Sequence, residues 1–125
     1  MSSISKESIP ITIDTPAYQA RTTQVGDLTL AFETIKVSHD ATPMFKGLPD
    51  DRCPCPHWGV MTSGRMTLNY PDGDKVYVAG DTFYMPPGHI PTAADPGTEF
   101  ITFSPTDELN QVWAVVAANA AAMAH

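Results

Sequence analysis

The segment Gly80-Asp81-Thr82-Phe83-Tyr84-Met85-Pro86-Pro87-Gly88-His89 decides the fold class of this chain. A Gly-Asp turn precedes a short apolar run, and a Pro-Pro-Gly turn follows it and ends on an imidazole. Short apolar runs bounded by glycine and proline turns are typical of β strands. The segment therefore predicts a strand at 82–85 with a tight turn at each end.

The same pattern continues outward on both sides. It predicts strands at 9–13, 18–25, 28–37, 59–63, 65–70, 76–78, 82–85 and 98–103. Proline in 9–13 marks an edge strand, because proline cannot donate to a ladder. Pro71-Asp72-Gly73-Asp74 predicts a hairpin turn, and 39–51 reads as a polar loop. Short strands at this spacing indicate an all-β sandwich or barrel.

The end of the chain switches to a helical pattern. Ser104-Pro105-Thr106-Asp107 predicts a helix start, with Ser104 as the N-cap and Pro105 in the first helical position. Apolar residues then recur at helical spacing and form one stripe: Leu109, Val112, Trp113, Val116, Ala120 and Met123. We expect one domain, 1–125, with a barrel over about 9–104 and a C-terminal helix over about 105–123 packed outside it.

Composition excludes several classes of partner. The chain has 125 residues, 42% of them hydrophobic, and a net charge of −7. A nucleic acid or an anionic membrane is not expected to bind such an acidic chain. No signal peptide or membrane-spanning run is evident, so we expect a cytoplasmic protein with both cysteines reduced.

The chemical signal lies in Cys53-Pro54-Cys55-Pro56-His57. Thiolate and imidazole suit zinc, copper or non-haem iron. If the chain is extended, Cys53, Cys55 and His57 point to one side. If the prolines impose a polyproline II helix, at most two of the three can share a metal. With His89 there are four candidate ligands, of which we expect three to bind one divalent transition metal, zinc first and iron second.

Other residues receive plainer interpretations. His39 is expected to be a solvated loop residue and Asp81 a turn residue. Asp50 and Asp51 are expected to end a solvated loop. The alternative is that one of them contributes to a site. Four aromatic residues are expected in the core or a pocket wall: Trp58, Phe83, Tyr84 and Phe100.

The spacing Gly80-x5-Pro86-x-Gly88 resembles the second sequence motif of the cupins. The resemblance extends over about 43–105, half of the chain. It implies a double-sheet jelly-roll barrel that holds one metal through a His-x-His pair, a glutamate and a later histidine. Counting from Gly64 and Gly88, the residues at the corresponding positions are Asp51, Cys53, His57 and Pro91. The residues at these positions thus differ from the family's usual metal ligands. His89 lies two residues before Pro91, and strand alternation would place both on the same face.

Three functions remain open at this point. The first is a metal-binding small-molecule enzyme of the cupin type: an oxygenase, isomerase or cyclase acting on a small organic acid or ketide. The alternative is a non-catalytic module, either a ligand-binding barrel or one with a closed structural zinc. The third is a protein that acts through association. A homodimer is expected from the apolar edge segment 9–13 and the helix that carries Trp113.

Overall fold

The computed structural model describes residues 3–123, which form nine strands and one α-helix. The elements are β1 (Ile11–Asp14), β2 (Tyr18–Val25), β3 (Leu28–Ile35), β4 (His57–Ser63), β5 (Arg65–Tyr70), β6 (Gly73–Val78), β7 (Thr82–Met85), β8 (Ile90–Ala94), β9 (Thr98–Pro105) and α1 (Thr106–Met123). Short 3-10 turns lie at Lys6–Ser8, Thr42–Phe45 and Pro49–Asp51. The predicted mostly-β architecture with one C-terminal helix is confirmed.

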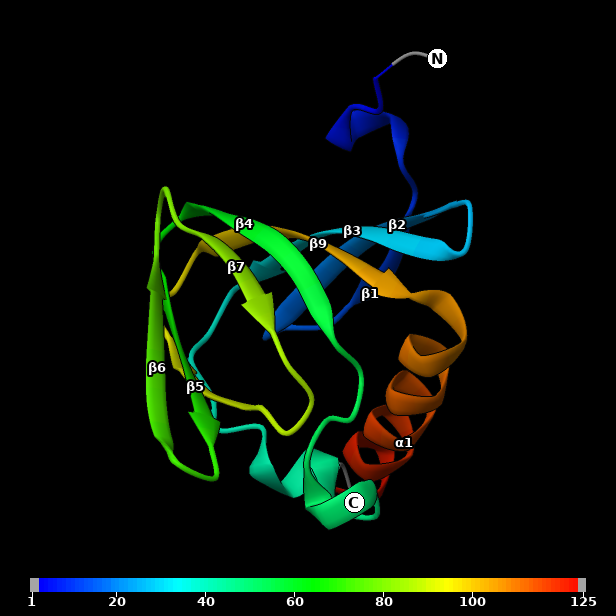
Figure 1. Ribbon diagram of the computed structural model, residues 1–125. Helices are drawn as coiled ribbons and strands as arrows, with labels where there is room; N and C mark the ends of the chain where they lie inside the picture. The colour runs from blue at the N-terminus through cyan, green and yellow to red at the C-terminus, as the bar shows by residue number, and fades with distance from the viewer. Residues whose placement is uncertain (1–2, 124–125) are drawn as a thin grey trace.

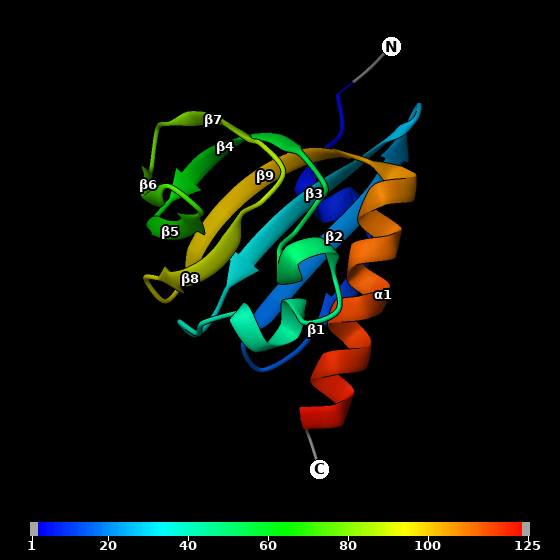
Figure 2. The ribbon, with the colours of Figure 1, turned by 60° about the horizontal axis from the view of Figure 1, so that its bottom comes forward.

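The strands form two antiparallel sheets. One has six strands in the order β1-β2-β3-β9-β4-β7, and the other has three in the order β6-β5-β8. Figures 1 and 2 show the sheets curving around a common interior, with α1 along one side. β1 is an edge strand, as Pro10, the residue just before it, predicted. None of the helical segments in residues 3–123 combines the length and apolarity needed to cross a bilayer.

Gly64 is the corner where the chain leaves the larger sheet and enters the smaller one. Its φ is +77°, and a Cβ placed there would lie 2.3 Å from Thr98 Oγ1. Only glycine accepts both the backbone angle and the close approach. This corner therefore sets the angle between β4 and β5.

β9 joins the early and late parts of the chain. It pairs with β3 from Leu28↔Pro105 to Ile35↔Thr98, and on its other side it pairs with β4. Residues 99–103 of β9 thus have their inward or outward direction set by two neighbouring strands. That register places Ser104 beside the start of β4.

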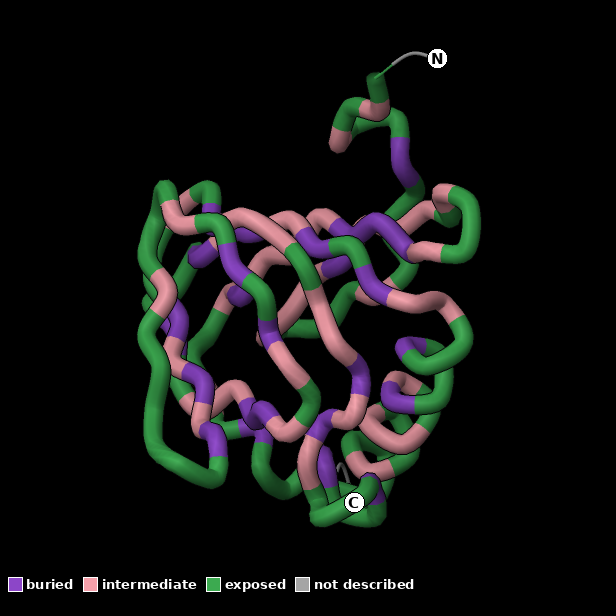
Figure 3. Tube along the Cα trace, viewed as in Figure 1, coloured by how far each residue is buried: buried purple, intermediate pink, exposed green. Residues whose placement is uncertain are grey.

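Two apolar clusters fill the molecule, and they account for much of the buried chain in Figure 3. The first lies between the sheets and includes Met61, Met66, Leu68, Phe83, Met85 and Phe100. The second lies under α1 and includes Phe45, Leu48, Cys53, Cys55, Leu109 and Val112. The helical stripe packs as far as Val116, and Ala120 and Met123 beyond it are exposed.

The predicted helix start is wrong in detail. α1 begins at Thr106, and Pro105 is the last residue of β9. The Ser104 hydroxyl is not free to cap the helix, because it hydrogen-bonds to His57. Thr106 anchors the helix instead: its amide donates to the Asp27 carbonyl at 3.1 Å, and its hydroxyl pairs with that of Thr29 at 2.9 Å.

Two further segments differ from the sequence prediction. β8 was missed, because Pro91 and the preceding turn hid a strand that pairs with β5. The segment 39–51 is not simply a polar loop. It buries Ala41, Phe45 and Leu48 beneath α1.

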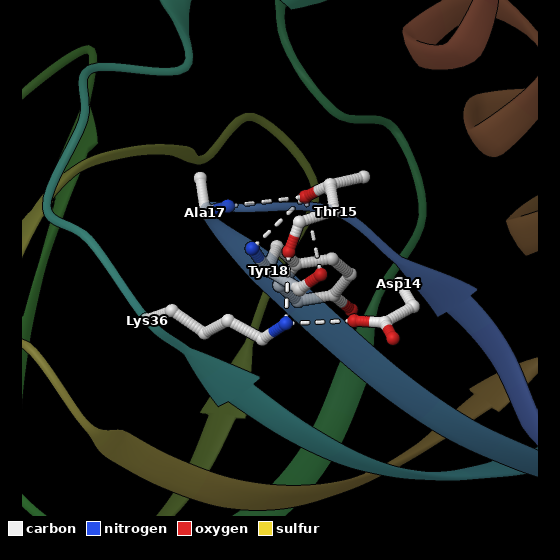
Figure 4. A network of polar contacts seen from close by, with 5 residues as sticks. All are labelled: Asp14, Thr15, Ala17, Tyr18 and Lys36. Atoms are coloured by element: carbon white, nitrogen blue, oxygen red, sulfur yellow. Dashed lines mark hydrogen bonds and ion pairs between the residues drawn. The ribbon is translucent and has the colours of Figure 1, made fainter.

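A polar turn fixes the start of β2 (Figure 4). The Thr15 hydroxyl accepts the amides of Ala17 and Tyr18, at 3.3 and 3.0 Å. Lys36 closes the turn from outside by donating to Asp14 Oδ1 at 2.7 Å and to the Thr15 carbonyl at 2.9 Å. Tyr18, opposite the buried Ile35, consequently enters β2 with its ring on the inner face of the sheet.

Candidate metal centre

The candidate site is built where the loop before β4 meets the turn before β8. The Cys53 amide donates to the His89 carbonyl at 3.1 Å, and the Gly88 amide donates to the Cys53 carbonyl at 2.8 Å. Arg52 holds the same junction, because its guanidinium donates to the Gly88 carbonyl at 3.0 Å and to Asn69 Oδ1 at 2.9 Å. Backbone hydrogen bonds therefore bring Cys53 and His89 together.

His57 reaches this junction from the first position of β4. Its Nδ1 lies 2.6 Å from Ser104 Oγ on the neighbouring β9. Its Nε2 lies 3.8 Å from Cys53 Sγ, and its ring centroid lies 4.9 Å from that of His89. The ligand atoms of Cys53, His57 and His89 all lie within 4.8 Å of one another.

These three side chains fit a transition metal in donor type and spacing. Ligand atoms around tetrahedral zinc lie about 3.5 Å apart, given bonds of about 2.0 Å to nitrogen and 2.3 Å to sulfur. The 3.8 Å between His57 Nε2 and Cys53 Sγ is already close to that value, and the other separations do not exceed 4.8 Å. Cys53 and His89 are buried, whereas His57 keeps some exposure.

Both imidazoles use Nδ1 for an outer partner and leave Nε2 for the site. His89 Nδ1 lies 2.9 Å from the Pro86 carbonyl, which can only accept, so this nitrogen carries the proton. Ser104 holds His57 in the corresponding way. A second partner on the distal nitrogen is the arrangement that orients histidine ligands in metal proteins.

Burial keeps all three groups neutral in the absence of a metal. It lowers the pKa of His57 to about 3, with a further contribution from His89, and it lowers the pKa of His89 against the effect of the Pro86 carbonyl. Burial also raises the pKa of Cys53 to about 11. A metal would therefore displace one thiol proton and no imidazole protons near neutral pH.

Cys55 stands apart from this group. Its Sγ lies 3.4 Å from the Pro56 carbonyl, and the residue is fully buried in the cluster under α1. Burial raises the pKa of this thiol to about 12. Residues 54–56 lie outside regular strand, so strict alternation does not hold there and only Cys53 and His57 face the site.

The remaining candidates lie elsewhere. Asp51 accepts the Gly47 amide at 2.9 Å, and Asp50 and Asp51 both have φ of +56°, so they shape a turn. Asp81 accepts the Val78 amide at 2.9 Å and is a turn residue, as predicted. His39 is partly exposed and approaches the Val37 carbonyl. Pro91, at the position the resemblance marks for a histidine, lies in β8.

Two of the four aromatic residues differ from expectation. Phe83 and Phe100 are buried in the core, but Trp58 is 46% exposed and Tyr84 is 50% exposed. The rings of Trp58 and Tyr84 stack at 5.3 Å, and Phe103 lies beside Trp58 in the next strand. Together these three residues form an aromatic row on the outer face of the six-stranded sheet.

Sequence reasoning missed the supporting residues. Ser104 was predicted to be a helix cap. Arg52 was not predicted to support the site, because its hydrogen-bond partners are 17 and 36 residues away in the sequence. Glu33 was not identified as a candidate from the sequence. Its cross-strand partner Phe100 is a core residue, so Glu33 faces inward. Cross-strand register, which needs the structure, was the missing signal.

No family model matches the sequence, and no curated protein matches it. Solved structures do match in fold. A structural-genomics protein of unknown function from Rhizobium leguminosarum aligns over 83% of this chain and 95% of its own, with a TM-score of 0.62 and 12% identity. An RmlC-like cupin from Shewanella frigidimarina covers 82% and 88%, at TM-score 0.56 and 18% identity. Ectoine synthase from P. lautus covers 84% and 78%, at TM-score 0.60 and 14% identity.

Proposed function

From the cupin fold that these structures share with the chain, we propose that the protein is a metal-dependent enzyme acting on a small organic molecule. The metal is one divalent transition ion, zinc, held by Cys53, His57 and His89. The substrate class is a small organic acid or ketide. At such a site the ion supplies Lewis-acid polarisation of a carbonyl, which suits isomerisation or cyclisation, and iron in the same place would suit oxygenation.

One observation carries the proposal: three of the four candidate ligands lie together, and the fourth, Cys55, is not among them. Structural zinc is typically closed by four protein ligands, whereas catalytic zinc keeps a position open for water or substrate. A three-ligand site with one partly exposed histidine supports catalysis.

The chain's own groups have defined tasks in this proposal. Ser104 and the Pro86 carbonyl hold the two imidazoles by Nδ1, and the Pro86 carbonyl also fixes the tautomer of His89 that offers Nε2. Arg52 fixes the turn that carries His89. Met85, buried beside His57 in the β4–β7 pair, keeps one side of the site apolar, which strengthens electrostatic interactions there.

The test is metal content of the purified protein after zinc loading and dialysis, measured by elemental analysis. Wild type should hold close to one zinc per chain. Cys53→Ser, His57→Ala and His89→Ala should each lose most of it. Cys55→Ser is the matched control and should keep it. A wild type without metal, or a Cys55→Ser variant as depleted as Cys53→Ser, would contradict the proposal.

A closed structural zinc is the second candidate, and the deep burial of Cys53 and His89 favours it. Cobalt substitution separates the two. In cobalt-loaded protein an open position lets azide bind and change the visible absorption bands, whereas a closed four-ligand site leaves the spectrum unchanged. We also propose a homodimer as the working assembly.

A further inference from the structure

A second polar group lies inside the barrel, away from the metal ligands. Glu33 of β3 faces the interior between Ala20 and Phe100, its cross-strand partners. Tyr18 donates its phenol to Glu33 Oε1, and Thr102 donates its hydroxyl to Oε2 at 2.6 Å. Three strands thus supply one carboxyl group and two oriented hydroxyls.

No cation compensates this carboxyl among residues 3–123. The ion pairs found there join Lys6 to Glu99 and Lys36 to Asp14, both near the surface. Burying a carboxylate without a counter-charge costs several kcal/mol, of the order measured for buried ions, so an apolar residue would stabilise the fold more. Burial also raises the pKa of Glu33, against the hydrogen bonds from Thr102 and Tyr18 that lower it.

The two hydroxyl donors do not saturate the group. An ionised carboxylate has about four acceptor positions, and Tyr18 and Thr102 use two of them. Glu33 also retains part of its accessible surface, as Tyr18 and His57 do, whereas Thr102 and Ser104 between them are buried. Acceptor capacity therefore remains on the carboxyl group.

The position of Glu33 relative to the metal centre is set by β9. Thr102 touches Glu33, and Ser104, two residues further on the same face, touches His57. Two residues of a strand span about 7 Å. A short ligand chain is long enough to extend from one group to the other along this strand.

We propose that Glu33, oriented by Tyr18 and Thr102, is a ligand-binding residue that receives the ammonium or hydroxyl end of a small organic acid whose oxygen-bearing end lies at the metal centre. This inference rests on the proposed function and narrows its substrate to amino or hydroxy acids. A protonated amine is the better match, because it brings the positive charge that the carboxylate lacks.

The probe pair is 5-aminopentanoate and pentanoate, which differ only in the terminal amine. Isothermal titration calorimetry with zinc-loaded protein measures both. Wild type should bind the amino compound at least about tenfold more tightly, as a charge-assisted hydrogen bond predicts. Glu33→Gln should bind both equally. Glu99→Gln, which removes an exposed carboxylate from the outer side of the molecule, should keep the preference.

Tyr18→Phe is the second variant, and it keeps the carboxylate while removing one orienting donor. It should reduce the preference, and it decides the question if Glu33→Gln does not fold. Equal affinities in wild type, no binding of either probe to protein of confirmed zinc content, or a preference that survives in both variants would overturn the inference. If wild type takes up no zinc, the proposed function fails, and the amine preference measured on metal-free protein still decides the role of Glu33.

Discussion

At the scale of single residues, the candidate site depends as much on outer partners as on ligands. Ser104 reaches His57 Nδ1 at 2.6 Å and fixes the ring. Ser104→Ala should lower zinc affinity by about 10–100-fold, the usual effect of removing such a partner, without unfolding the protein. Competition with a chelating dye measures the affinity. Ser63→Ala, which removes a hydroxyl at the far end of β4, should leave it unchanged.

The buried histidines also give the metal-free protein a defined response to acid. The pKa of His57 falls from 6.5 to about 3 on folding, chiefly through burial. Below pH 6.5 the unfolded chain therefore takes up a proton that the folded chain does not. The free energy of unfolding should be insensitive to this group above pH 6.5, and should fall below it by up to about 1.4 kcal/mol per pH unit.

Urea denaturation of wild type and His57→Gln between pH 7.5 and 4.5 measures the free energy of unfolding of each protein. The contribution of His57 is the difference between their slopes of this free energy against pH. The variant should lose less stability in acid than wild type. His39→Gln, at a partly exposed loop position, should follow wild type. Identical slopes in wild type and His57→Gln would show that the imidazole is protonated in the folded state.

At the scale of elements, the corner at Gly64 is the most constrained turn. Gly64→Ala combines a φ of +77° with a contact of 2.9 Å between the new Cβ and Thr98 Cα. We expect a loss of about 2–4 kcal/mol, the sum of backbone strain and overpacking. Gly80→Ala has a similar φ of +96° with no atom within 4 Å, so it should lose only about 1 kcal/mol. Chemical denaturation checks both, and equal losses would contradict a steric role for Thr98.

The elements also show how far sequence reasoning carries. Period-two alternation and glycine or proline turns located β2, β5 and β7 at their observed ends, because these local signals agree with the tertiary structure. β8 was not predicted, because it begins directly after a turn and contains Pro91. For β3, both faces hold buried residues, Leu30 and Ala31, so alternation could not say which face turns inward.

The candidate site was only partly accessible to the same reasoning. Ligand types and spacing pointed to Cys53, Cys55, His57 and His89, and the structure groups three of them. Which cysteine joins depends on the backbone at 54–56, where no regular periodicity applies. Ser104 and Glu33 depend on cross-strand register, which is a property of the folded sheet.

At the scale of the whole molecule, the aromatic row is the surface on which we expect two copies to meet. Trp58, Tyr84 and Phe103 lie side by side on three strands, each more than a third exposed. Antiparallel sheets pack face to face, and a two-fold arrangement sets one row against another copy of itself. The test is Tyr84→Asp, because a charge within such a contact opposes burial.

Sedimentation should show wild type as a dimer at tens of micromolar, an order-of-magnitude concentration suited to moderate affinity. Tyr84→Asp should sediment as a folded monomer. Val76→Asp, at an exposed apolar position on the smaller sheet, is the control and should remain dimeric. A monomeric wild type, or a Tyr84→Asp variant that stays dimeric, would remove this face as the interface.

The central position of β9 also bears on how the chain is made. Leu28 pairs with Pro105 and Ile35 with Thr98, so the six-stranded sheet cannot close until residues 98–105 have left the ribosome. Until then β3 and β4 each expose an unpaired edge. Pairing over such separations is slow, typically milliseconds to seconds. A nascent chain stalled before residue 98 would therefore hold two incomplete half-sheets, and for that interval it would depend on chaperones to avoid aggregation.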